Sequence, residues 1–151
     1  MKKVYKDIFA QFWNMYLDLL MLNHKINPYI YTLKSGQIIP KDLKDFSLVE
    51  KIRYCFMLDQ TCCENHVDAI LLFDYVDLDN TTDLPEILKY PTGEFGIIGE
   101  MFTLDKQYIG RYIEYIKEDD KIIQMTKDLE IKDKGIYNKL FPKYTEGVTY
   151  V

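Results

Sequence analysis

The sequence predicts a mainly α fold: a compact single-domain helical bundle of about four to six helices with a small β-hairpin, spanning residues 1–151. Three observations predict it. Apolar residues recur at helical spacing near the N-terminus, a capping box marks an internal helix start, and isoleucines and tyrosines recur every three to four residues in the C-terminal half. The length is that of one ordinary domain, and no repeat or long linker divides it.

The first predicted helix runs from Val4 to Leu22. Its apolar residues follow a spacing of three or four positions and cover more than half of the helix circumference. A helix with so wide an apolar surface is expected at the centre of a fold or under a partner. Residues 23–28 end it. Two short extended runs follow within residues 29–39, around Ser35-Gly36, and predict the β-hairpin.

The middle of the chain carries two helix-start signals. Ser47 and Glu50 have the spacing of a capping box, which begins a helix that extends through Leu58. A second helical stretch is predicted over residues 67–76, and whether residues 61–65 separate the two stays open. Residues 77–82 read as a polar loop. Asp83 and Pro85 then mark another helix start, because proline is tolerated in a first helical turn.

The last part of the chain predicts one long helix. Residues 91–99 form a connector with glycines at positions 93, 96 and 99, which we interpret as turn or bulge glycines. Thr103 can cap a helix that starts at Leu104 and extends to about Glu130, with a bend near Asp119-Asp120. Gly135 ends this helix, and a short turn and a polar tail follow.

Two stripes of side chains run along this long predicted helix. The isoleucines make one stripe, which should face the core. Tyr108, Tyr112 and Tyr115 make a second stripe, rotated by about 100°. Tyrosine suits a boundary where the ring is buried and the hydroxyl is wet, and it is enriched at protein interfaces. The alternative interpretation is the rim of the protein's own core.

A long acidic segment is the sharpest clue to function. Between Arg53 and Lys89 the chain has eight carboxylates and no lysine or arginine, so this segment carries −8 while the whole chain carries −5. Such a block attracts cations or the basic surface of a partner. We therefore predict a partner-binding surface that combines acidic and tyrosine side chains. Its predicted residues are Asp74, Asp77, Asp79, Asp83, Glu86, Tyr108, Tyr112 and Tyr115.

A metal site is the weaker alternative. Cys55, Asp59, Cys62 and His66 would align along one unbroken helix, and thiolate and imidazole are zinc ligands. One straight helix cannot wrap four ligands around an ion, because the stripe exceeds roughly 15 Å. A nucleophile at Cys62 or Cys63 with His66 lacks a visible orienting group. We expect no catalytic residue, cofactor or metal.

Composition adds hints about origin and compartment. Alanine occurs only twice, whereas lysine and isoleucine supply 17 residues each and tyrosine 13, which suggests an AT-rich genome such as that of a low-GC bacterium or its phages. Three cysteines without framework spacing indicate a reduced protein. The sequence shows neither a signal peptide nor an uncharged run of the roughly 20 residues that span a bilayer. We expect a cytoplasmic protein without a membrane partner.

These observations favour a non-enzymatic protein–protein interaction module that presents an acidic patch to a basic partner. It would act as an assembly factor, an inhibitor or an accessory subunit, and a sharper version is a phage-encoded inhibitor whose carboxylates stand where phosphates belong. Direct nucleic-acid binding is not expected, because stacking tyrosines would need a basic groove. Two alternatives stay open: a small metal-dependent enzyme or zinc-stabilised domain using Cys62, His66 and nearby aspartates, and an oligomeric connector subunit.

Overall fold

The computed structural model describes residues 1–151 except 23–24, 80–83, 133–134, 148 and 151. Its strands are β1 (Tyr29–Lys34), β2 (Gln37–Asp42), β3 (Ala69–Val76), β4 (Phe95–Thr103), β5 (Gln107–Glu118), β6 (Lys121–Ile131) and β7 (Thr149–Tyr150). The first six form an antiparallel sheet in the order β2-β1-β3-β4-β5-β6, and β7 pairs in parallel with β5. The predicted mainly α bundle is therefore wrong.

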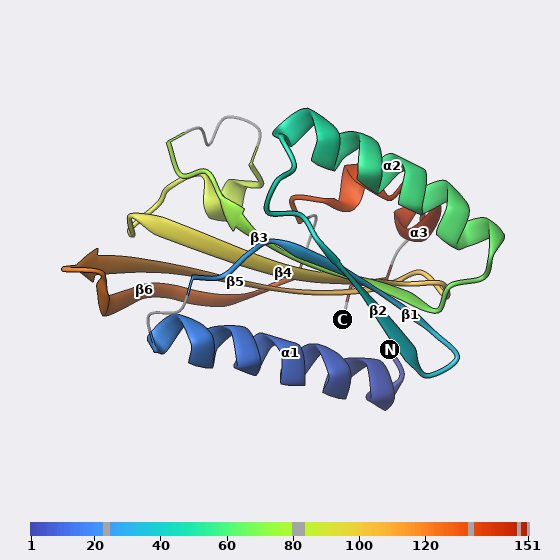
Figure 1. The fold of residues 1–151 in the computed structure, drawn as a ribbon, viewed down its shortest axis with the longest axis horizontal. Helices are drawn as coiled ribbons and strands as arrows, with labels where there is room; N and C mark the ends of the chain where they lie inside the picture. The colour runs from blue at the N-terminus through green and yellow to red at the C-terminus, as the bar shows by residue number, and fades with distance from the viewer. Residues whose placement is uncertain (23–24, 80–83, 133–134, 148, 151) are drawn as a thin grey trace.

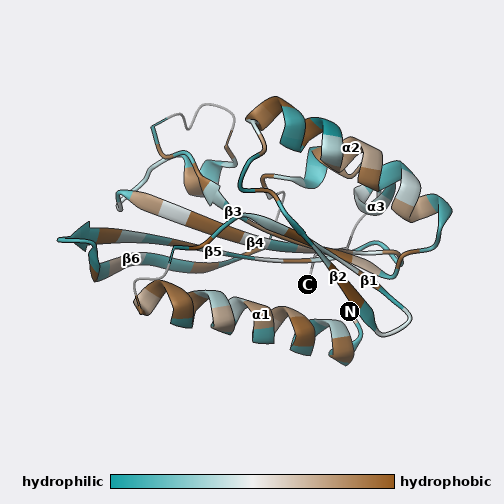
Figure 2. Ribbon diagram, in the orientation of Figure 1, coloured by the Kyte–Doolittle hydropathy of each residue, from teal (hydrophilic) through white to brown (hydrophobic). Residues whose placement is uncertain are grey.

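Helices cover both faces of this sheet (Figure 1). They are α1 (Lys3–Met21), α2 (Leu48–Glu64), α3 (Pro142–Thr145) and the 3-10 helices η1 (Glu86–Leu88) and η2 (Asn138–Leu140). Helix α1 lies on one face, whereas α2, η2 and α3 lie on the other. Each face has its own hydrophobic core. Figure 2 shows that the central strands between the two cores are largely hydrophobic.

Three local predictions are confirmed. Helix α1 forms where the apolar stripe predicts it, and its buried residues Phe9, Trp13 and Tyr16 pack against the sheet. Ser35 and Gly36 make the two-residue turn of the β1–β2 hairpin, with φ values of 51° and 79°. Both values are positive, as a type I′ turn requires. The capping box at the start of α2 also forms, since the Ser47 side chain accepts the N–H of Glu50.

The predicted helix over residues 67–76 is instead the central strand β3. This strand is buried along nearly its whole length because α1 covers one face and α2 covers the other. A strand that is buried on both faces shows a continuous apolar run instead of alternation. Such a run cannot be distinguished from a buried helix by periodicity alone.

The predicted long helix over residues 104–130 is the β5–β6 hairpin. The misleading signal was the spacing of four residues between Tyr108 and Tyr112, which equals about one helical turn but also two strand repeats. In the strand, these two tyrosines lie in the core beside α2. Tyr115 lies in the core beside α1, because it is three positions from Tyr112 and side chains an odd number of positions apart point to opposite faces. Asp119 and Asp120, where a bend was predicted, are the turn between the strands, with φ values of 52° and 62°.

Two glycines of the predicted connector lie inside β4 and make room for aromatic rings. A Cβ at Gly99 would stand 2.7 Å from Cε1 of Phe73 and 3.0 Å from the Trp13 ring. On the other face, a Cβ at Gly96 would stand 2.8 Å from the Tyr112 hydroxyl. The glycines therefore serve close ring packing within the sheet and not turns.

The helix start predicted at Asp83 and Pro85 is followed by a single turn of 3-10 helix, η1. Asp83 itself lies outside the described residues. Thr103, the predicted cap of the long helix, lies at the β4–β5 turn. Its hydroxyl accepts the N–H of Gln107 at 3.0 Å, so it orders a strand connection instead of a helix start.

Candidate functional site

The described residues of the acidic segment do not form one continuous surface. Asp59 is buried and accepts the backbone N–H of Lys143 at 2.9 Å, which anchors the start of α3. Asp68 lies at the opposite end of β3 from Asp77 and Asp79. Carboxylates that are close in sequence thus lie in separate parts of the fold. The described residues therefore do not form the single acidic patch that the sequence predicts.

Asp74 lies inside the protein. Its carboxylate forms an ion pair with Lys51 of α2, with 2.9 Å between Nζ and Oδ2, and it also accepts a hydrogen bond from the hydroxyl of Tyr137. A buried carboxylate needs such partners, because removal from water otherwise penalises its charge. Asp74 therefore ties α2 and the C-terminal segment to the sheet and offers no surface to a partner.

The three tyrosines of the predicted interface are also interior residues. Tyr108, Tyr112 and Tyr115 are 0%, 0% and 1% exposed. The prediction placed them at a wet boundary because it assigned them to one helix face, whereas in β5 both faces of the strand are covered by helices. In this fold they act as core residues.

The remaining acidic residues of the prediction lie beyond the end of β3. Asp77 and Asp79 are exposed, and the N–H of Asp79 donates to Oδ1 of Asp77 at 3.0 Å, which orders the turn between them. Glu86 is exposed on η1 and pairs with Lys89 at 3.6 Å. An exposed pair of this kind contributes little stability and leaves the carboxylate accessible.

Asp77 and Asp79 line a hollow of about 450 Å³ that we call the strand-end groove. Its walls are residues 75–79 at the end of β3, residues 94–96 at the start of β4, and Tyr115 and Lys117 of β5. Antiparallel pairing brings these segments together, because Phe95 is in register with Tyr115. The groove lies at the end of the sheet where the β3–β4 connection and the β5–β6 turn are found (Figure 1).

The groove combines carboxylates with exposed aromatic rings. Glu94 lines the groove together with Asp77 and Asp79. Its backbone N–H donates to the carbonyl of Tyr115 at 3.0 Å, which fixes the position of this residue. Tyr75 and Phe95 are each 41% exposed, although α1 and the sheet bury most other rings. Partial burial raises the pKa of Tyr75, so its hydroxyl is neutral in the physiological range.

One ammonium group already occupies the aromatic part of the groove. Nζ of Lys117 lies 5.3 Å from the ring centroid of Phe95 and 5.9 Å from that of Tyr115. The two rings are stacked with their centroids 5.5 Å apart. These distances are those of cation–π interactions. The groove is thus able to hold a cationic side chain against its rings, with three carboxylates nearby.

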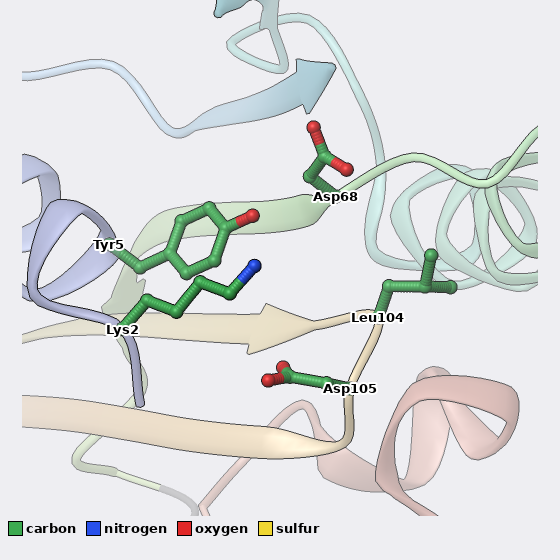
Figure 3. Close-up of a pocket in the computed structure, with 5 residues that line it drawn as sticks. All are labelled: Lys2, Tyr5, Asp68, Leu104 and Asp105. Atoms are coloured by element: carbon green, nitrogen blue, oxygen red, sulfur yellow. The ribbon is translucent and has the colours of Figure 1, made fainter. Parts of the chain in front are cut away.

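A second hollow, of about 360 Å³, lies at the start of α1, and we call it the helix-start cavity. Lys2, Tyr5, Asp68, Leu104 and Asp105 line it. Figure 3 shows the Lys2 ammonium pointing into the space between the two carboxylates. The Asp68 carboxylate accepts the N–H of Ser35 at 2.9 Å, which joins the hairpin to this end of the sheet. Burial and the two carboxylates raise the pKa of Tyr5.

Glu100 and Glu114 are fully buried on the α2 side of the sheet. Glu100 accepts the backbone N–H of Ile136 at 2.7 Å, and burial raises its pKa to about 7. Glu114 accepts the hydroxyl of Tyr112 at 2.6 Å and lies 3.3 Å from Lys127 Nζ. Both carboxylates bind parts of the chain itself, so we assign them to holding the fold together.

The residues of the predicted zinc alternative point to different surroundings. Cys62 is buried in the core, His66 is exposed just beyond α2 with a φ of 52°, and Asp59 is engaged with Lys143. Burial raises the pKa of Cys55 to about 12, so its thiol stays protonated. Within the described ranges, no group of three or more histidine, cysteine or acidic side chains is arranged to hold a metal ion.

Comparisons with known proteins supply no identity for this arrangement. No protein-family model, curated protein or solved structure matches the chain. In the part of the chain that the structure describes, no helix has both the length and the apolar character needed to cross a membrane.

Four charged or aromatic residues that line the strand-end groove were missed by sequence reasoning: Tyr75, Glu94, Phe95 and Lys117. Tyr75 and Asp77 are two positions apart in an extended segment, which places both on one side of the strand. This spacing places the two side chains together only if residues 69–76 are recognised as a strand. The other three join the groove through the pairing of β4 with β5, which local sequence does not specify.

Proposed function

We propose that this protein is a non-enzymatic protein–protein interaction module that binds a basic segment of a partner protein in the strand-end groove. The observation that supports the proposal is the position of Lys117, whose ammonium lies over Phe95 in a groove that is lined in part by Asp77, Asp79 and Glu94. Assembly factor, inhibitor and accessory subunit are all roles that such a module can fill.

The chemistry of the groove favours arginine and lysine side chains as ligands. Carboxylates attract a cation over a distance and aromatic faces bind it at contact. Guanidinium suits this combination better than ammonium, because it stacks on rings and forms paired hydrogen bonds with carboxylates. Exposed Tyr75 and Phe95 supply the apolar contact area that purely electrostatic surfaces lack.

The surroundings of these carboxylates support recognition over catalysis. Asp77, Asp79 and Glu94 are all exposed to solvent. Among the residues described as lining the groove there is neither histidine nor cysteine. A solvated acidic rim speeds encounter with a charged partner and selects against acidic ones. The oligomeric connector alternative stays a prediction, because it concerns copies of the chain and not this groove.

The test uses a defined peptide probe, acetylated tetra-arginine amide, titrated into the purified protein by calorimetry. The decisive variant combines Asp77→Asn, Asp79→Asn and Glu94→Gln, which removes charge while asparagine at position 77 keeps the oxygen that orders the turn. We expect this variant to bind the peptide at least about tenfold more weakly than the natural protein.

A matched control variant combines Asp7→Asn, Asp45→Asn and Glu146→Gln, three exposed residues outside the groove. It changes the net charge by the same amount as the groove variant. When salt screens long-range effects, its affinity for the peptide should stay within about twofold of that of the natural protein. Equal weakening in both variants would overturn the proposal, because the affinity would then follow net charge and not the groove. Absence of any binding in roughly 50 mM salt would overturn it as well.

A further inference from the structure

The helix-start cavity adjoins a second hollow, which we call the apolar hollow because aliphatic side chains form half of its lining. That hollow has a volume of about 170 Å³ and shares the walls Tyr5 and Asp68 with the cavity. Its other lining comes from the first turns of α1 and from the β1–β2 hairpin. The apolar residues that line it are Val4, Ile8, Leu33 and Ile38. A cavity with charged side chains and a hollow with mainly aliphatic side chains therefore lie side by side, and Asp68 belongs to the walls of both.

The two compartments differ in chemistry in a way that specifies a ligand. In the cavity, two carboxylates face one ammonium, so it retains an excess of negative charge. In the apolar hollow, Val4 is 55% and Ile38 is 42% exposed although both border a concave surface. Burying such side chains under a ligand is favourable by the hydrophobic effect. A matching ligand carries a cation close to an aliphatic group.

The edge strand beside the hollow limits how a peptide can bind there. Lys34 and Gln37 close the two-residue turn as a hydrogen-bonded pair, and such pairs alternate with non-hydrogen-bonded pairs along the ladder. Ile38 and Pro40 therefore stand at non-hydrogen-bonded positions, where the backbone polar groups point away from β1. Pro40 has no N–H, and an added strand would lose a donor at this point. A bound segment is therefore held by its side chains in the two compartments and not by extension of the sheet.

We infer that the helix-start cavity and its apolar hollow bind a short extended segment of a partner protein, with a lysine or arginine in the cavity and an aliphatic side chain in the hollow. The Lys2 side chain points into the same space as the incoming cation (Figure 3). It acts as an internal competitor that the ligand displaces. This site lies at the opposite end of β3 from the strand-end groove and does not depend on it.

The proposed site is tested by NMR titration of the isotope-labelled protein with two blocked peptides, leucine-alanine-lysine-alanine and lysine-alanine-leucine-alanine. Both orders are used because side chains two positions apart lie on the same side of an extended peptide. We expect one of them to shift signals of residues around Tyr5, Ile38, Asp68 and Asp105. A blocked tetra-alanine peptide serves as the negative control.

Variants then separate the two compartments. Asp105→Asn keeps an oxygen for the Thr103 hydroxyl and should weaken binding at least about fivefold through lost charge. Ile38→Ser should weaken it at least about threefold through lost apolar contact. Lys2→Ala should strengthen it at least about twofold, whereas the exposed Lys6, changed to alanine, should have a smaller effect than Lys2→Ala.

The inference is overturned if no peptide shifts these signals, or if Lys2→Ala and Lys6→Ala change the affinity equally. Equal effects would mean that net charge alone drives binding. These outcomes leave the proposed function untouched, because none of the four variants alters a residue that lines the strand-end groove. Loss of tetra-arginine binding in the groove variant, conversely, says nothing against the helix-start site.

Discussion

The buried carboxylate of Glu100, in the middle of β4, accepts the backbone N–H of Ile136 at 2.7 Å. This bond joins the centre of the sheet to the C-terminal segment that passes beneath α2 (Figure 1). The same segment is held by Tyr137, which donates to Asp74, and by Tyr144, which donates to the carbonyl of Val67 at 2.9 Å. The C-terminal residues are thus an integral part of one core.

Glu100 makes the stability of the fold depend on pH. Burial raises its pKa to about 7 from an ordinary 4.5, so the folded protein holds this proton more tightly than the unfolded chain does. Its stabilising contribution is present below pH 4.5 and is lost as the pH rises through 7. Between pH 5 and pH 8 we expect a loss on the order of 2 kcal/mol in the free energy of unfolding.

The measurement for Glu100 is urea unfolding followed by the fluorescence of the single tryptophan, Trp13, at both pH values. Glu100→Gln should remove this component, so that the variant loses less stability than the natural protein between pH 5 and pH 8. Parallel pH dependence in the two proteins would contradict the assignment.

Gly99→Ala tests the position of β4 against the ring of Phe73. The added Cβ would approach Cε1 of that ring to 2.7 Å, and overpacking of this kind typically costs about 1–3 kcal/mol in the free energy of unfolding. Thermal unfolding measures the effect. A stability equal to that of the natural protein would indicate that Gly99 lies in an open connector, as the sequence predicted, and not in a packed strand.

The three cysteines should differ in reactivity because α2 buries them unequally. Cys55 and Cys62 are buried, and burial raises the pKa of both thiols, whereas Cys63 is half-buried. Since the thiolate is the reactive form, we expect Cys63 to react first with a thiol reagent under native conditions at pH 8. Cys63→Ser should abolish this fast phase. Fast reaction of all three thiols in the native protein would contradict the placement of α2.

We expect Lys117 to compete with the ligand proposed for the strand-end groove. Lys117→Ala removes the ammonium from the face of Phe95 and should strengthen tetra-arginine binding at least about twofold. Lys139→Ala is the control, because Lys139 is exposed outside the groove and its loss changes net charge equally. An equal or stronger gain in the control would show that net charge alone drives the effect and that the ammonium of Lys117 does not occupy the binding position.

Local signals in the sequence predicted local structure well. Helix α1, the Ser35-Gly36 turn and the capping box at Ser47 depend on residues within a few positions of each other. The strands β3 and β5 were predicted as helices for two physical reasons. Burial on both faces erased the alternation in β3, and the spacing of four between Tyr108 and Tyr112 fits a helix and a strand equally.

The candidate site could be predicted only in part. Asp77 and Asp79 were identified from charge, and they do line the strand-end groove. Asp74 was grouped with them because it is close in sequence, but Lys51 of another element neutralises it in the interior. Phe95 and Lys117 could not be found, because the register of β4 with β5 brings them to the groove and no local pattern specifies that register.

The most direct measurement maps tetra-arginine binding on the isotope-labelled protein by NMR, residue by residue. We expect the largest signal changes at Tyr75, Asp77, Asp79, Phe95 and Lys117, and we expect these changes to be much smaller in the groove variant. Changes of equal size spread over exposed acidic residues elsewhere, such as Asp7 and Glu146, would contradict it.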